Sequence, residues 1–435
     1  MTQQPLDPIC IIGSGVAGVT AALELRKRSD HRIVIVSSES PDYFSRPALM
    51  YVFMGHMRWS DIVIHRNQFF IQKGIEFIHD ALISVDFDMH EITLKSNKSL
   101  RYNSLIIATG SLPKSLSWVP SSSTNIGSFY DQYDLQYLLN NSHKINNAVI
   151  IGGGLIGVEM AEMLRSKGSN VTIIIREKSY WSSVLCDEES EMIHKYIENE
   201  CGVKIYRECE IAKANLDGDL NVYELEDTFG RKHPCDYVGI TVGVIPNVHI
   251  FLNTTLKIKR GILVDEYFKT NIENVYAIGD CAELNFPSQG RKQIEAVWYV
   301  ARKMGEHLAV NLSSNPKPYQ QDLWYNSAKF FHVLYHVYGF VPPIISSPLD
   351  TLVWQDQQNK KSLRLVFEKN SLKLVGIQSL GISLKQDSCE YWIRHELNWT
   401  NVVAQIESAF FEQEFVNLHA AQIKNFFLQH KHSMQ

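Results

Sequence analysis

The sequence predicts an α/β protein in which one strand–helix–strand unit occurs twice and a smaller α+β module follows. The first unit has apolar strands at residues 9–12 and 33–36 on either side of a glycine-rich turn and a helix. The second unit has the same order, with strands at 147–151 and 171–175 and a helix at 155–167. This order is typical of parallel sheets that are covered by helices.

Length and charge limit the possible functions. A chain of 435 residues exceeds what a single hydrophobic core supports, so we expect about three domains. The 42 basic and 47 acidic side chains give a net charge of −5. This is the wrong sign for a protein that binds polyanions over a broad surface, so nucleic acid is not expected as a partner.

The cysteines and the apolar runs indicate a cytoplasmic protein. Seven cysteines are scattered without a C-x-x-C pair, so neither a disulfide framework nor a structural metal is expected. The first eight residues do not resemble a signal peptide, and no apolar run reaches the roughly 18 residues that span a bilayer. His332 and His336 are interpreted as structural, because no cysteine or acidic partner lies near them in the sequence.

Both glycine-rich turns have the spacing G-x-G-x-x-G and lie between a buried strand and a helix. The first reads Gly13-Ser14-Gly15-Val16-Ala17-Gly18, and the second reads Gly152-Gly153-Gly154-Leu155-Ile156-Gly157. In such turns two glycines let the backbone approach a pyrophosphate, the third allows close packing, and the helix N-terminus offers free N–H groups. We therefore predict two Rossmann-like three-layer nucleotide-binding domains, which fit FAD plus NAD(P)H better than one cofactor.

Three further segments resemble the FAD-dependent pyridine nucleotide oxidoreductases, nearest the branch of ferredoxin, rubredoxin and nitrite reductase flavoproteins. They are Ala108-Thr109-Gly110, Ala277-Ile278-Gly279-Asp280, and Phe44 to Leu49, which contains Arg46. The resemblance covers residues 8 to about 312. It implies an enzyme that passes a hydride from NAD(P)H to FAD and then electrons to an external acceptor, either a small electron-carrier protein or a small molecule.

The resemblance also implies the flavin contacts. Besides the first turn, these are Arg46, Ala108, Thr109, Gly110, Gly279 and Asp280, whose carboxylate would bind the ribityl chain. Glu39 is the expected ribose ligand, although Ser37 occupies the usual end-of-strand position. Glu295, in a helix expected at residues 293–305, is either a flavin contact or a glutamate that stabilises the first turn.

The second turn and Gly243 are expected to contact the nicotinamide dinucleotide. Glu159 resembles a catalytic glutamate near the nicotinamide, and a plain helix glutamate is the alternative. Arg176 lies at the end of the next strand, where an arginine favours a 2′-phosphate. This favours NADPH, although the adjacent Glu177 leaves NADH open.

Two further features affect the expected chemistry. There is no cysteine between Cys10 and Cys186, so an internal redox disulfide is not expected. Tyr51 stands where many relatives have a lysine near the flavin. Two alternatives stay open: a quinone reductase anchored to a membrane surface by a helix at residues 415–429, and a non-catalytic redox-regulated flavoprotein resembling apoptosis-inducing factor.

The predicted domain order places one nucleotide-binding domain inside the other. The FAD-binding domain comprises residues 1–124 and 246–312, because the strand that precedes Gly279 is expected to return to the first sheet. The NAD(P)-binding domain comprises residues 125–245, and a C-terminal α+β domain comprises residues 319–435. In the last domain we expect an antiparallel sheet and a helical tail with one apolar face, formed by Val416, Ala420, Ile423 and Phe427. The oligomeric state is not predicted.

Overall fold

A computed structural model describes residues 7–120, 123–288, 290–356, 358, 360–411 and 418–431. Its internal contacts divide the chain into two compact units. Unit 1 consists of Met1–Lys114, Tyr130–Leu139 and Gly243–Gln321, and unit 2 consists of Ser115–Phe129, Asn140–Val242 and Asp322–Gln435. Each unit contains one of the two predicted strand–helix–strand repeats.

Unit 1 is built on a five-stranded parallel sheet. The strand order is β21 (Val275–Ala277), β9 (Ser104–Ile107), β1 (Ile9–Ile12), β2 (Ile33–Ser37) and β5 (Ile75–His79). The β1, β2 and β9 strands are buried along their whole length, as expected for continuous apolar runs in a parallel sheet. Because β21 pairs with β9, the prediction that this late segment returns to the first sheet is confirmed.

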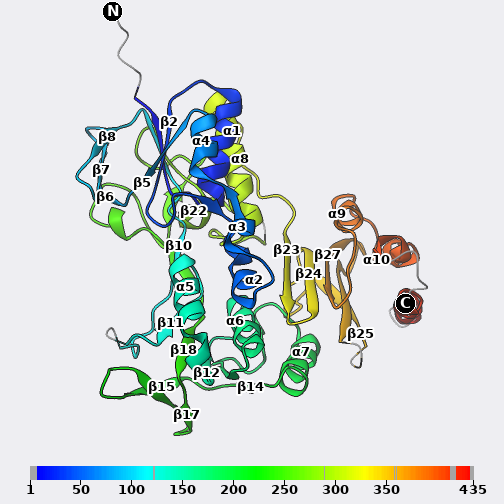
Figure 1. Cartoon of the computed structure of the whole chain (residues 1–435). Helices are drawn as coiled ribbons and strands as arrows, with labels where there is room; N and C mark the ends of the chain where they lie inside the picture. Colours follow the sequence, from blue (N-terminus) through cyan, green and yellow to red (C-terminus); the bar gives the residue numbers. More distant parts are fainter. Residues whose placement is uncertain are drawn as a thin grey trace, which may run out of the picture. The chain divides into compact units, whose positions relative to one another are not determined.

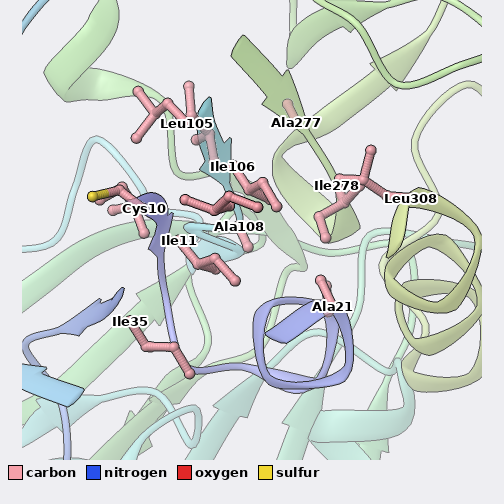
Figure 2. Packing of buried hydrophobic residues seen from close by; sticks show 14 of the residues in the cluster. Cys10, Ile11, Ala21, Ile35, Leu105, Ile106, Ala108, Ala277, Ile278 and Leu308 are labelled. Carbon is pink, nitrogen blue, oxygen red and sulfur yellow. The ribbon is translucent and has the colours of Figure 1, made fainter. Parts of the chain in front are cut away.

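Two helices cover one face of this sheet. The α1 helix (Val16–Arg28) and the α8 helix (Trp298–Ser313) lie side by side (Figure 1). They approach so closely that a Cβ atom at Gly305 would lie 2.5 Å from the Ala17 carbonyl oxygen. In Figure 2, Ile11 and Ile106 lie on the side of the sheet that faces Ala21 of α1, whereas Cys10 points to the opposite side.

Shorter elements complete unit 1. An antiparallel sheet is formed by β6 (Leu82–Asp86), β7 (Glu91–Leu94) and β8 (Ser99–Arg101). The two-stranded sheets are β3 (Tyr43–Phe44) with β4 (Val63–His65), β10 (Ser111–Pro113) with β19 (Val244–Pro246), and β20 (Ile262–Val264) with β22 (Ala282–Leu284). The short helices are α2 (Leu49–Met54), α3 (Trp59–Ile62) and α4 (Asn67–Gln72), and α5 (Gln132–Asn141) begins in this unit.

Unit 2 contains the second parallel sheet. Its strands, in spatial order, are β11 (Ile126–Gly127), β18 (Tyr237–Ile240), β12 (Asn147–Ile151), β13 (Asn170–Ile174) and β14 (Val203–Tyr206). The helices of this part are α6 (Leu155–Ser166) and α7 (Asp187–Asn199), and an antiparallel sheet is formed by β15 (Ile211–Leu216), β16 (Val222–Asp227) and β17 (Lys232–Pro234). The predicted second repeat is therefore confirmed.

An antiparallel sheet forms the C-terminal part of unit 2. Its strand order is β23 (Tyr325–Phe330), β24 (Val333–Gly339), β27 (Leu374–Leu380), β26 (Lys361–Glu368) and β25 (Leu349–Asp356). The remaining helices are α9 (Gln386–Arg394), α10 (Trp399–Ala404) and α11 (Leu418–Lys431), and α9 contacts β24 and β27 (Figure 1). The pairing of β26 with β27 confirms the expected antiparallel sheet.

The structure corrects one helix and refines another. The helix expected at 293–305 begins only at Trp298 and continues to Ser313. In α11, Ala420, Ile423 and Phe427 are buried, as the apolar face predicted, whereas Val416 lies outside the described residues. Among the helices formed by the described residues, none is both long enough and apolar enough to cross a membrane.

Candidate functional site

The turn between β1 and α1 contains three motif glycines. Packing within the chain leaves no room for a side chain at Gly13 or Gly18, but it leaves room for one at Gly15. A Cβ atom at Gly13 would collide with the Ala108 carbonyl oxygen, and Gly13 has a φ of +114°. A Cβ atom at Gly18 would collide with the Gly13 carbonyl oxygen. Nothing lies within 4 Å of a Cβ atom at Gly15, so this glycine borders open space at the start of the helix.

The α1 N-terminus next to that space is suited to an anion. Gly15 is the N-cap residue, no side chain caps the helix, and its first turn contains no acidic residue. The N–H groups and positive dipole of the helix are therefore not neutralised by a side chain of the cap or first turn. The helix N-terminus and the open space at Gly15 fit a pyrophosphate, which would approach the backbone at Gly15 without meeting a side chain.

The turn between β12 and α6 repeats this geometry. A Cβ atom at Gly152 would lie 2.6 Å from the Thr241 carbonyl oxygen, and one at Gly157 would collide with the Gly152 carbonyl oxygen. Gly154 again borders open space and is the N-cap residue of α6, with no side-chain cap and no acidic residue in the first turn. Leu155 and Ile156 are the first two residues of this helix. The second turn therefore fits a second pyrophosphate.

Glu39 and Arg46 lie together in unit 1. The Arg46 guanidinium donates to both carboxylate oxygens of Glu39, one of them at 3.1 Å. The Gln132 backbone N–H also donates to this carboxylate, at 3.3 Å. Burial disfavours the charge on Arg46, but the Glu39 carboxylate outweighs this effect and raises the Arg46 pKa. Ser14 of the glycine turn donates to the Ser37 hydroxyl at 2.7 Å, which ties the turn to the end of β2.

Asp280 and the segment that follows β9 are also brought together. The Ser111 hydroxyl donates to Asp280 Oδ2 at 2.8 Å. Burial raises the Asp280 pKa, and the Ser111 bond and the Arg46 charge oppose this shift. Gly279 has a φ of +75°, and a Cβ atom there would lie 3.0 Å from that of Ala17 in α1. Asp280 is therefore close to the first glycine turn, although 262 residues separate it from Gly18 in the chain.

Backbone contacts hold Thr109 and Gly110 in place. The Thr109 hydroxyl donates to the Asn247 carbonyl at 2.7 Å, and the Asn247 N–H donates to the Gly110 carbonyl at 2.9 Å. Ala108 supplies the carbonyl oxygen against which Gly13 packs. Asn247, Ser111, Tyr130 and Gln132 were not predicted from the sequence, where no motif distinguishes them.

Glu295 does not lie in a helix. It precedes the first residue of α8 by three positions, and its carboxylate is almost fully buried. Arg291 donates to both of its oxygens, at 2.8 and 2.7 Å, and the Gln321 side chain donates to one of them at 2.9 Å. The expected position of Glu295 at the start of a helix is wrong, because α8 begins only at Trp298.

Glu159 shares a helix face of α6 with Glu162, and Lys329 of β23 lies beside them. The Lys329 ammonium group donates to Glu162 at 2.7 Å, and both side chains are largely buried. Burial raises the Glu159 pKa to about 7, Lys329 opposes this shift, and Glu162 adds to it. Glu159 is therefore a carboxyl group that exchanges its proton near neutral pH, as general acids and bases do.

Arg176 and Gly243 both lie where a strand ends. Arg176 follows β13 by two residues, has an exposed side chain, and donates to the Glu177 carboxylate at 3.0 Å. Gly243 has a φ of +100°, and nothing lies within 4 Å of a Cβ atom there. Its carbonyl accepts from the Lys114 N–H at 3.0 Å. Both residues are exposed or border open space, which a ligand contact requires.

Buried thiols are the remaining reactive groups near the predicted flavin residues. Burial raises the Cys10 pKa to about 12 and also raises the Cys281 pKa. Neither thiol is therefore a thiolate at neutral pH, and thiols in this state are poor nucleophiles. The seven cysteines, all among the described residues, are free. The described part of the chain has no group of three His, Cys, Asp or Glu residues that could bind a metal ion.

Comparison with known proteins agrees with this geometry. The profile of the family "Pyridine nucleotide-disulphide oxidoreductase" matches residues 7–305. The NADH-rubredoxin oxidoreductase of Clostridium acetobutylicum is 30% identical over 315 residues, which are 72% of this chain and 76% of that protein. The assimilatory nitrate reductase electron transfer subunit of Bacillus subtilis is 27% identical, over 64% of this chain and 36% of that protein. The chain thus spans little more than a third of this relative.

Solved structures show the same fold. A ferredoxin reductase from Rhodopseudomonas palustris superposes with a TM-score of 0.78 at 24% identity, covering 86% of this chain and 91% of that chain. An NAD-dependent persulfide reductase from A. fulgidus superposes with a TM-score of 0.83 at 20% identity, covering 98% and 84%. The fold and the two glycine turns define an α/β flavoprotein with two dinucleotide-binding folds and a C-terminal α+β part. The chain belongs to the pyridine nucleotide-disulphide oxidoreductase family, whose members use FAD and NAD(P)H.

The raised Glu159 pKa predicts a pH-dependent stability. Because the folded state binds this proton more tightly than the unfolded state, the free energy of unfolding should fall as pH rises from about 4.5 to about 7. Glu159→Gln removes the ionisation, so this variant should gain about 1–3 kcal/mol relative to wild type between pH 5 and pH 8. Urea unfolding of both proteins at these two pH values measures the difference.

Two further variants test whether the raised Glu159 pKa causes this dependence of stability on pH. Lys329→Met removes the charge that opposes the shift, so the stability loss should extend to higher pH. Glu273→Gln replaces an exposed glutamate and should leave the pH profile unchanged. If the free energy of unfolding changed with pH in the same way in wild type and in Glu159→Gln, the assignment of a raised pKa to Glu159 would be contradicted.

Proposed function

We propose that the chain is an FAD-dependent NAD(P)H oxidoreductase that transfers a hydride from NAD(P)H to FAD and then electrons to an external acceptor. The observation that carries this proposal is the pair of glycine turns, each with an open central glycine and a helix N-terminus that no side chain caps. When bound, the flavin supplies the redox chemistry, because it accepts two electrons as a hydride and can release them one at a time. The protein binds and orients both cofactors.

The proposed FAD site consists of the first turn and the residues gathered around it. Gly13, Gly15 and Gly18 would admit the pyrophosphate to the start of α1, with Ser14 and Ala17 beside it. Glu39 and Arg46 form the charged group at one end, while Asp280 and Gly279 lie at the other, next to Ala108, Thr109 and Gly110. Glu295 stays a proposed flavin contact, with its carboxylate fixed by Arg291 and Gln321.

The proposed nicotinamide site uses the second turn. Gly152, Gly154 and Gly157 would receive the pyrophosphate, with Leu155 and Ile156 lining it, and Arg176 would contact the ribose or its 2′-phosphate. Glu159 would lie near the nicotinamide, where a carboxyl group with a pKa near 7 can hold or release a proton as the ring changes charge.

The proposed domain division follows the two parallel sheets. We propose an FAD-binding domain of residues 1–124 and 246–312, an inserted NAD(P)-binding domain of residues 125–245, and a C-terminal α+β domain of residues 319–435. The return of β21 to the first sheet supports the insertion. The antiparallel sheet of β23 to β27 supports a third domain.

We propose ferredoxin, rubredoxin or a small molecule as the acceptor. Relatives named as rubredoxin reductases, and one named as the ferredoxin reductase component of a dioxygenase, support an electron-carrier protein.

Buried thiols in the described residues fit a cytoplasmic protein that needs no internal disulfide. A membrane anchor at residues 415–429 is disfavoured, because Ala420, Ile423 and Phe427 are buried in the C-terminal core.

Flavin binding tests the proposal directly. We expect the purified protein to be yellow with non-covalent FAD, and we expect Asp280→Ala to lose the flavin because the ribityl contact is removed. The absorption spectrum, and the flavin released on denaturation, measure occupancy. A wild-type protein that takes up no FAD on reconstitution would refute the assignment. Reduced flavin that forms but passes electrons to no acceptor would instead favour a non-catalytic flavoprotein.

Arg176 should determine the preference between the two nicotinamide cofactors. A charged hydrogen bond to a 2′-phosphate contributes about 1.5–3 kcal/mol, which corresponds to roughly tenfold to a hundredfold in affinity. Arg176→Ala should therefore weaken NADPH by this factor and spare NADH, as measured by titration of the oxidised holoprotein. The relatives named for NADH or NAD(+) favour the opposite preference. Equal losses for both cofactors, or a wild type that prefers NADH, would contradict this assignment.

Electron transfer should need no cysteine. Cys10 and Cys281 are buried and have raised pKa values, so neither can act as a thiolate relay. We expect the Cys10→Ala/Cys281→Ala variant to reduce its flavin and turn over acceptor within about tenfold of wild type. Stopped-flow reduction followed by acceptor addition separates the two steps. Normal flavin reduction with loss of transfer to the acceptor would show that a thiol relay exists.

A further inference from the structure

A continuous chain of five side chains connects the charged residues of the proposed flavin site. It runs from Glu39 through Arg46, Tyr130 and Ser111 to Asp280. Arg46 donates to Glu39, its guanidinium carbon lies 4.6 Å from the centre of the Tyr130 ring, the Tyr130 and Ser111 hydroxyls are 3.2 Å apart, and Ser111 donates to Asp280 at 2.8 Å. Tyr130 is the central member: its ring contacts Arg46 directly, and its hydroxyl reaches Asp280 through Ser111.

Tyr130 reaches this position from a distant part of the chain. The segment Tyr130–Leu139 belongs to unit 1, whereas the residues on both sides of it belong to unit 2. Both backbone polar groups of Tyr130 are fixed: its N–H donates to Asp134 Oδ2 at 2.7 Å, and its carbonyl accepts from Arg46 Nη1 at 2.5 Å. The ring is therefore anchored at the start of α5 by contacts on either side of it.

The direction of the hydrogen bonds follows from proton counting. A serine hydroxyl has one proton, and Ser111 uses it to donate to the Asp280 carboxylate. The Ser111 oxygen must therefore accept from Tyr130. Burial raises the Tyr130 pKa, so the phenol keeps its proton at neutral pH and can act as this donor. The chain thus polarises Ser111 toward Asp280, where a buried carboxylate needs donors.

The Tyr130 ring has a separate effect on Arg46. A guanidinium group over an aromatic face is stabilised by the electrons of the ring, and the effect grows as water is removed. The Tyr130 carbonyl and the Glu39 carboxylate fix the same guanidinium group from other directions. Arg46 therefore has few alternative positions, which lowers the entropy cost of binding a ligand beside it.

We propose that Tyr130 is a positioning residue of the flavin site, whose ring holds Arg46 and whose hydroxyl holds Asp280 through Ser111, so that both charged groups are in place before FAD binds. This inference rests on the proposed function. It assigns to the α5 segment a role in flavin affinity that none of the glycine or aspartate motifs contains.

The ring and the hydroxyl can be tested separately. Tyr130→Phe keeps the ring over Arg46 but loses the bond to Ser111, so the dissociation constant of FAD should rise about 2- to 10-fold. Tyr130→Ala loses both contacts, and it should rise about 10- to 100-fold. Titration of apoprotein with FAD, followed by quenching of flavin fluorescence, gives the constants. The visible spectrum of the bound flavin in Tyr130→Phe should also shift, because Ser111 is no longer fixed by Tyr130 and orients Asp280 less firmly.

A double-mutant cycle distinguishes this chain from a general packing effect. Ser111→Ala removes the direct donor to Asp280 and should weaken FAD at least as much as Tyr130→Phe does, and the double variant should bind FAD no more weakly than Ser111→Ala. Tyr223→Ala removes an exposed tyrosine of β16 in unit 2 and should leave FAD affinity unchanged. Thermal unfolding of each apoprotein identifies variants that fail to fold, and Tyr130→Phe and Ser111→Ala decide the result if Tyr130→Ala is among them.

The possible outcomes separate this inference from the proposed function. Wild-type affinity for FAD in Tyr130→Phe and Ser111→Ala, or fully additive losses in the double variant, would overturn the role of Tyr130 while leaving the flavin site intact. A wild-type protein that binds no FAD would overturn the proposed function itself.

Discussion

The close approach of backbone to backbone in the two glycine turns is the constraint on which the rest of the structure depends. The third glycine of each turn packs against the carbonyl oxygen of the first. The first glycine packs against the carbonyl oxygen of the residue that directly follows a neighbouring strand. A side chain at any of these positions would push the helix away from the sheet. Because the contacts are present in both copies, each helix starts at the carboxyl edge of its sheet with its N–H groups directed at open space. A helix N-terminus placed in this way is suited to an anion.

The charged groups of each unit are held by partners that come from distant segments. In unit 1, Asp280 depends on Ser111, and Arg46 depends on Tyr130. In unit 2, the buried Glu189 of α7 accepts from Ser362 at 2.9 Å and from Gln378 at 2.5 Å, both in the C-terminal sheet. A buried carboxylate with two such donors would be costly to separate from them. This contact helps to hold the C-terminal sheet against the second nucleotide-binding fold, which belongs to the same compact unit.

The C-terminal sheet also brings a charge to the proposed nicotinamide site. Lys329 of β23 pairs with Glu162, one helical turn from Glu159, and it opposes the effect of burial on the Glu159 pKa. The C-terminal part therefore does more than pack against α6, because it also affects the pKa of Glu159. Its lysine influences the charge of the carboxyl group that would face the nicotinamide, so that group is tuned by two parts of the chain far apart in sequence.

The sequence alone determined the elements whose causes are local. Glycines that need a positive φ or close approach, apolar strands and the residues that end them are encoded within a few positions, and the turns at Gly13 and Gly152, the strands around them and the return of the strand before Gly279 were all predicted correctly. Only the tertiary structure decided the start of α8, the partners of Glu295, and the presence of Tyr130, Ser111 and Lys329 beside predicted site residues. The contacts of Arg46 with Tyr130, of Lys329 with Glu162 and of Ser111 with Asp280 join residues 84, 167 and 169 positions apart. Such contacts depend on how sheets and helices pack, which no local pattern of residues contains.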